Sequence, residues 1–144
     1  MNINSNYSPV PIEIQNNILQ SALLEWQKII QTFVDQKIYG YFEYIEAMYK
    51  RIYLEKLMEK DQGADAGIVR KHIAFLDKTY YENTYPLDGF IKCPNTLIER
   101  YFFSRMPLGI DRFFKDELAK EDIQVASKDY FKKIFYLENT STLE

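Results

Sequence analysis

The clearest pattern in the chain is a helical spacing of apolar residues near its N-terminus. From Leu19 to Val34, apolar side chains recur every three or four residues, which places them on one face of a helix. Pro11 suits the first turn of that helix, where a backbone N–H has no partner within the helix. Residues 1–10 are mostly polar, and we expect them to form an arm ahead of it. This pattern predicts a long first helix.

The same spacing resumes after Gly40. The apolar face of this second run is formed by Tyr41, Ile45, Met48 and Ile52. One unbroken helix over 12–60 would extend roughly 74 Å at about 1.5 Å per residue, whereas a compact chain of this size has a radius of gyration of about 15 Å. Glycine is costly inside a helix. We therefore predict a break at Gly40 and two long helices.

The rest of the chain predicts shorter helices joined by turns. Residues 61–67, "DQGADAG", indicate a loop, and a third amphipathic run follows to about Tyr81. The stretch 96–99 matches a capping box and should begin another helix. Further helical runs begin near Ile110 and at Ser127.

Two segments lack a helical period. Residues 83–95 contain Pro86 and Pro94 and predict a long ordered loop. Alternation over 122–126 leaves a short strand there as an alternative. Residues 139–144 form a polar tail. Together the elements predict an all-α single domain over 1–144, a compact bundle of about five to six helices in which two long N-terminal helices precede shorter ones.

Composition agrees with a folded globular chain and bounds its chemistry. Hydrophobic residues make up 47% and charged residues 27%, and the net charge of −3 argues against binding nucleic acid by phosphate neutralisation. The single cysteine excludes an internal disulfide, and the start lacks the regions of a signal peptide. No stretch has the length of a membrane span. We expect a cytoplasmic protein, and the many residues with A/T-rich codons favour a bacterial source.

Residues with catalytic or metal-binding chemistry are few. His72 lies on the apolar flank of the third helix, and Cys93 stands between Lys92 and Pro94. One histidine and one cysteine do not make a zinc site of the usual type, and "DQGADAG" fails the spacing of a calcium loop. We therefore expect no metal, no cofactor and no enzymatic activity. An enzyme that uses His72 or Cys93 is an alternative.

Aromatic residues are unusually abundant, with 12 Tyr, 10 Phe and 1 Trp among 144 residues. In "YGYFEYIEAMYKRIY", residues 39–53, Tyr44 falls on one shoulder of the apolar stripe, and Tyr49 and Tyr53 fall on the other. Such rings either seal the edge of a core or contact a partner, because tyrosine is also enriched at interfaces.

A second group of tyrosines ends the third helix and begins the following loop. Tyr80, Tyr81 and Tyr85 stand here beside the acids Glu82 and Asp88. Rigid tyrosines next to adaptable polar groups are typical of binding surfaces. The alternative is a loop that its own tyrosines seal.

These features favour a non-catalytic protein-binding module, and within that class an inhibitor of a toxin enzyme, such as an immunity protein or antitoxin. Its partner would be a basic toxin domain whose active site it occludes, and the protein itself would be a monomer or a homodimer. The candidate partner-binding residues are Tyr80, Tyr81, Glu82, Tyr85, Asp88, Tyr44, Tyr49 and Tyr53.

A different class of function is also open. Residues 99–115 interleave rings with the basic side chains Arg100, Arg105, Arg112 and Lys115. Stacked rings and cations along a backbone are how proteins bind single-stranded nucleic acid. Acidic neighbours such as Glu99 and Asp116 argue against this alternative.

Overall fold

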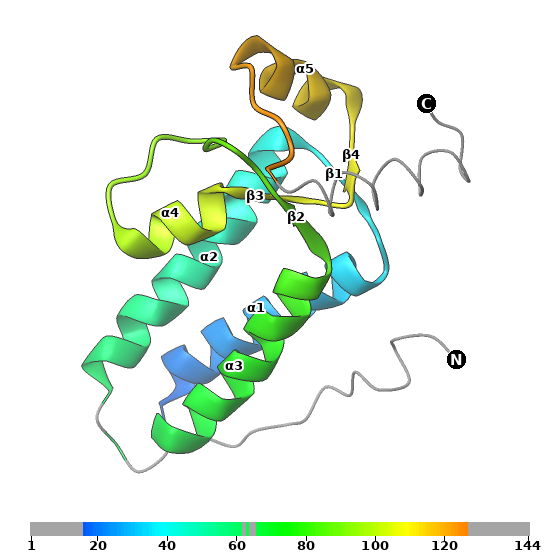
Figure 1. The fold of residues 1–144 in the computed structure, drawn as a ribbon. Coiled ribbons are helices and arrows are strands. Elements are labelled where there is room, and N and C mark those ends of the chain that lie inside the picture. The colour runs from blue at the N-terminus through cyan, green and yellow to red at the C-terminus, as the bar shows by residue number, and fades with distance from the viewer. Residues whose placement is uncertain (1–15, 62, 64–65, 127–144) are drawn as a thin grey trace.

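The computed structural model describes residues 16–61, 63 and 66–126. This part of the chain forms five helices and four short strands, and Figure 1 shows how they are arranged. The helices are α1 (Asn17–Val34), α2 (Tyr41–Lys60), α3 (Ala66–Glu82), α4 (Leu97–Phe103) and α5 (Arg112–Lys120). The strands are β1 (Ile38–Tyr39), β2 (Thr84–Pro86), β3 (Arg105–Pro107) and β4 (Gly109–Ile110). The fold is therefore mostly helical as predicted, but the prediction of a purely all-α protein is wrong.

Helix α1 begins at Asn17, later than the predicted start. The side chain of Asn16 accepts hydrogen bonds from the backbone N–H groups of Ile18 and Leu19, both at 3.1 Å, and so caps the first turn. Pro11 and the rest of the polar arm lie outside the described residues. Among the described helices, none is both long enough and apolar enough to cross a membrane.

The helical run is interrupted where the sequence predicts, although Gly40 plays a different part. Helix α1 ends at Val34, and Gln36 takes the left-handed conformation with φ of 57°. Gly40 is instead the extended N-cap residue of α2, and its N–H donates to Oε1 of Glu43 at 3.3 Å. The glycine therefore begins the second helix rather than ending the first.

The segment predicted to be a long loop starts with a strand. Strand β2 pairs antiparallel with β3, with Tyr85 opposite Met106. Leu87 then forms a bridge with Val125, so the alternating stretch 122–126 does contain a strand-like contact. Local spacing missed this sheet because its strands are only three residues long. The helix predicted from Ser127 and the polar tail lie outside the described residues.

The core is built from large rings that all five helices contribute. Among the described residues, six aromatic side chains are fully buried: Trp26, Tyr44, Tyr80, Phe102, Phe103 and Phe114. Tyr44 donates a hydrogen bond of 2.9 Å to the carbonyl O of Arg105, and its hydroxyl lies 2.7 Å from that of Tyr80. Burial raises the pKa of both phenols far above the usual value. The two hydroxyls are therefore neutral hydrogen-bonding groups inside the core.

An ion pair joins the three longest helices at the edge of this core. Nη2 and Nε of Arg51 on α2 donate to the carboxylate of Asp77 on α3, at 2.7 and 3.0 Å. The same carboxylate accepts a 3.0 Å hydrogen bond from Nε1 of Trp26 on α1. Burial opposes the charge of Arg51, but the hydrogen bonds and charge of Asp77 outweigh it and raise the Arg51 pKa. The contact fixes how the helices cross.

Candidate protein-binding surface

Strand pairing places the starts of two helices side by side. Strands β1 and β4 are parallel, with Ile38 opposite Gly109, and each is followed directly by a helix. The N–H of Asp111 extends the pairing by donating to the carbonyl O of Tyr39 at 3.0 Å. Because paired strands lie about 4.8 Å apart, α2 and α5 begin as close neighbours, as Figure 1 shows.

Both helix starts are capped by carboxylates. Oδ1 of Asp111 accepts a 2.9 Å hydrogen bond from the N–H of Phe114, and Glu43 accepts one from Gly40. A Cβ atom at Gly40 would lie 3.3 Å from Oδ2 of Asp111, so a larger residue would crowd the second cap. The positive ends of both helix dipoles are thus already matched by negative charge. This location is therefore not an anion site.

The geometry sets two phenylalanine rings together on the surface. Phe42 and Phe113 are the second residues of α2 and α5, and their ring centroids are 5.8 Å apart. Phe42 is 68% exposed and Phe113 is 48% exposed. Tyr41 supports both rings in edge-to-face contacts, and its hydroxyl donates to the carbonyl O of Ile91 at 2.7 Å. We call Phe42 and Phe113 the aromatic pair.

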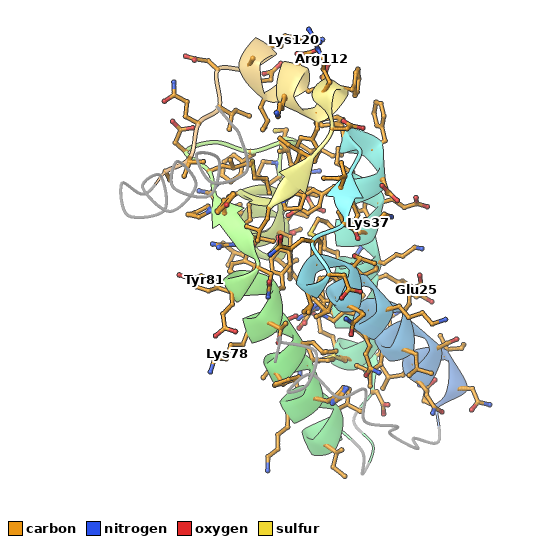
Figure 2. The ribbon with its side chains drawn as sticks, turned by 90° about the vertical axis from the view of Figure 1, so that its right-hand side faces the viewer. Glu25, Lys37, Lys78, Tyr81, Arg112 and Lys120 are labelled. Atoms are coloured by element: carbon orange, nitrogen blue, oxygen red, sulfur yellow. The ribbon has the colours of Figure 1, made fainter. Side chains whose placement is uncertain are left out.

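Carboxylates outnumber basic groups on α5 and the turn after it. The five acids are Asp111, Asp116, Glu117, Glu121 and Asp122, and the three bases are Arg112, Lys115 and Lys120. Figure 2 shows Arg112 and Lys120 at this end of the molecule. Burial, followed by the charges of Glu117 and Glu121, raises the pKa of Tyr41. Negative charge therefore reaches the base of the aromatic pair.

Three of the eight predicted partner-binding residues are buried in the core. Tyr44 and Tyr80 share the buried hydrogen bond described above, and Tyr85 lies on β2 with 3% of its surface exposed. Burial leaves these three side chains almost no surface for a partner, and the prediction that they contact one stays a prediction. Helical spacing put Tyr44 on a shoulder, but α1 and α4 both pack on α2 and widen its buried face.

The other five are exposed, but they do not form one patch. Tyr49 and Tyr53 lie on α2, and Tyr81 and Glu82 end α3, where the guanidinium of Arg105 lies 4.3 Å from the Tyr81 ring centroid. Asp88 uses its carboxylate to accept a 2.8 Å hydrogen bond from the N–H of Gln124. Figure 2 shows Tyr81 at the end of α3.

The aromatic pair itself was missed by the sequence analysis. Hydropathy favours phenylalanine in the core, and residues 100–115 were considered only as a possible nucleic-acid surface. The available signal was a capping residue two positions before each ring, Gly40 before Phe42 and Asp111 before Phe113. The signal becomes useful only once the two helix starts are known to be neighbours.

A shallow groove lies between α1 and α2. Its volume is about 460 Å³, and its lining residues are Asn17, Ile18, Ser21, Ala22, Glu25, Lys50 and Tyr53. Lys50 of α2 and Glu25 of α1 form an ion pair of 3.1 Å between the two helices. Figure 2 shows Glu25 on the outer side of α1. The groove places Tyr53 beside an open, largely apolar hollow.

The residues considered for catalysis have different surroundings. Nε2 of His72 lies 2.8 Å from Oε1 of Gln27, and partial burial lowers the histidine pKa. Cys93 is exposed in the loop before α4. Within the described ranges, no group of three or more His, Cys, Asp or Glu side chains could hold a metal ion.

The segment considered for nucleic-acid binding does not form one surface. Arg105 is buried on β3, where its Nε donates to Oγ1 of Thr84 at 2.8 Å. The guanidinium of Arg100, a residue of α4, lies 5.2 Å from the centroid of the Phe90 ring in the loop before that helix. Phe102, Phe103 and Phe114 are core residues. Arg105 therefore does not share an accessible surface with the other three basic residues of this segment, and nucleic-acid binding stays an untested alternative.

The chain matches no protein-family model, no curated protein and no solved structure in the comparisons made with each. The kind of site therefore follows from the side chains exposed on this surface alone. Exposed aromatic side chains with charged groups around them are typical of the central contacts in protein–protein interfaces.

Proposed function

We propose that this protein is a non-catalytic binding module that neutralises a basic toxin enzyme by covering its active site, as an immunity protein or antitoxin does. The exposed aromatic pair is the single observation that carries this proposal. A few large side chains supply most of the free energy at protein interfaces, and full burial of one Phe contributes about 1.5–3 kcal/mol. Phe42 and Phe113 are two such side chains already in contact.

Charge supports the choice of a basic partner. The excess of carboxylates over basic groups across residues 111–122 would attract a positive surface and speed its association. Enzymes that cleave nucleic acids bind a phosphate backbone and therefore carry positive charge near their active sites. A toxin of that chemistry would place its basic groups against Asp116 and Glu121, with the aromatic pair at the centre of the contact.

Rigidity supports the same surface. The two rings are presented by helix starts that strand pairing, two carboxylate caps and the Tyr41 hydrogen bond hold in place. A preorganised surface loses little conformational freedom on binding, so more of the contact energy becomes affinity. The proposal therefore centres on Phe42 and Phe113 and no longer includes the eight residues that the sequence predicted.

Growth rescue tests this function. Each gene adjacent to the gene for this protein is expressed in a bacterial host, with and without the full chain. We expect one product to arrest growth and the intact chain to restore it. The double variant F42A/F113A should lose the rescue, because each truncated ring should weaken binding by about tenfold or more.

Tyr81→Ala is the matched control, since Tyr81 is an exposed ring on a different part of the surface. It should rescue growth as the unchanged chain does. Rescue that survives F42A/F113A would contradict the proposed surface. If no adjacent product is toxic or binds the chain, the inhibitor proposal itself is contradicted.

A further inference from the structure

Helix α2 carries a second exposed feature, distinct from the aromatic pair. Glu46, Tyr49, Tyr53 and Lys56 are separated by three, four and three residues, and all four are exposed. Spacings that alternate between three and four place side chains in a straight row along a helix, as in the contact seam of a coiled coil. We call these four residues the α2 seam.

The charged ends of the seam have no ionic partner in the described part of this chain. On the α1 side of the helix, Lys50 pairs with Glu25, and nearer the helix start Glu43 pairs with Lys37. By contrast, Glu46 and Lys56 form no ion pair with any other described residue. Two opposite charges therefore stand at the two ends of an exposed row.

The order of the residues makes the seam complementary to itself. When two copies are aligned in opposite directions about a twofold axis, Glu46 of each faces Lys56 of the other. Tyr49 of each then faces Tyr53 of the other, which brings four rings together at the centre. A parallel alignment would instead set Glu46 against Glu46 and Lys56 against Lys56, and like charges repel.

The surroundings of the two tyrosines fit this arrangement. The Tyr49 ring is held edge-to-face against Phe103 of α4, with 5.5 Å between centroids. Tyr53 borders the groove of about 460 Å³ between α1 and α2, which offers apolar space beside it. A ring from a facing copy could therefore pack against the Tyr49 ring on one side and into the groove beside Tyr53 on the other.

We propose that the α2 seam binds a second copy of this chain in an antiparallel twofold dimer. The seam runs over the 11 residues from Glu46 to Lys56, so its contact is about 15 Å long and the dimer should be weak and concentration-dependent. One helical turn further from the twofold axis, Lys60 of each copy would face Phe42 of the other copy. Phe113 on α5 lies outside the seam. This proposal is independent of toxin neutralisation.

Sedimentation of the full chain at low salt, up to about 1 mM protein, measures the monomer–dimer equilibrium. Glu46→Lys and Lys56→Glu each create two like-charge contacts across the axis, and each should weaken the dimer about tenfold or more. The double variant E46K/K56E restores both contacts and should dimerise as the unchanged chain does. A mixture of the two single variants should form a heterodimer.

Glu82→Lys is the matched control, because it makes the same change of charge at an exposed position on α3 and should leave the equilibrium unchanged. Circular dichroism of every variant shows whether it is folded. A chain that stays monomeric over the whole range would overturn the proposal. So would a dimer that is indifferent to both single changes, or a double variant that stays dissociated.

Discussion

Two residues of the same helix, Phe42 and Tyr44, occupy opposite environments. Tyr44 carries a hydroxyl and is completely buried, whereas the more apolar Phe42 is largely exposed. The buried hydroxyl donates to the carbonyl O of Arg105 and contacts Tyr80, so its burial leaves no polar group without a partner. The comparison teaches that position in the fold, rather than hydropathy, separates the rings of the core from those of the surface.

The core and the aromatic pair also differ in how completely other side chains surround their residues. In the described part of the chain, no buried side-chain N or O atom lacks a hydrogen-bond partner. The interior rings are also fully buried among other side chains, so the loss of one should leave a cavity and cost stability. The aromatic pair has neighbours on one side only, so its loss should cost little stability and should act on binding instead.

The sharpest contrast uses adjacent residues of α5. Phe114 is fully buried and Phe113 is nearly half exposed. Phe114→Ala should lower the free energy of unfolding by about 3–5 kcal/mol, because it leaves a cavity in the core. Phe113→Ala should lower it by less than about 1 kcal/mol. Urea denaturation of both variants measures the difference, and equal losses would contradict the division of the rings.

Breaking the ion pair between α2 and α3 should have the next largest effect on the free energy of unfolding. Asp77→Ala removes one of the two carboxylate partners of the buried guanidinium of Arg51 and the acceptor of Trp26 Nε1. We expect a loss of about 3 kcal/mol, at the lower end for a broken buried pair, because Asp77 is itself partly exposed and Glu55 still pairs with Arg51. Glu25→Gln, which breaks an ion pair whose two side chains are both exposed, is the control and should leave the unfolding midpoint nearly unchanged.

A smaller effect should follow from removing one buried hydroxyl. Tyr44→Phe keeps the ring but leaves the carbonyl O of Arg105 and the hydroxyl of Tyr80 without this partner. The unfolding free energy should fall by about 1–3 kcal/mol. Tyr53→Phe makes the same chemical change at an exposed position and should have almost no effect. A Tyr44→Phe variant as stable as the Tyr53→Phe variant would show that the buried network is not needed.

The smallest effect concerns His72. Its pKa is lowered by burial from an ordinary value of 6.5, so the unfolded chain binds a proton more readily than the folded one. The contribution of neutral His72 to the free energy of unfolding is complete above pH 6.5 and is lost as the pH falls below this value. His72→Gln, which can still hydrogen bond to Gln27, should flatten the slope of stability against pH between about 7.5 and 5.5. An unchanged slope would show that His72 titrates normally.

The sequence was sufficient for the helices and for part of the core. Helical spacing placed Met48 and Ile52 inside, as the structure has them, and put Tyr44, Tyr49 and Tyr53 on the two shoulders of the stripe. It misplaced Tyr44, because the spacing of one helix does not show how many neighbours will pack on it. That number depends on α4, which lies far along the chain.

The candidate surface depended on information that local spacing does not contain. Strands β1 and β4 are two residues long, and a pairing between such short and distant segments leaves no periodic signal. Without that pairing, Phe42 and Phe113 are two unrelated apolar residues at helix starts. With it, they become one exposed pair. The pairing of β2 with β3, which are also short and separated in sequence, explains why Arg105 is buried rather than available to a phosphate.

The central claim is that Phe42 and Phe113 face solvent while Phe102 and Phe103 of α4 and Phe114 of α5 do not. It is tested most directly by ¹⁹F NMR of chain labelled with fluorophenylalanine, in the presence of a soluble paramagnetic gadolinium chelate and at a concentration where the protein is monomeric. The resonances of Phe42 and Phe113 should broaden strongly, and those of Phe102, Phe103 and Phe114 should stay sharp. Equal protection of Phe113 and Phe114 would contradict the account.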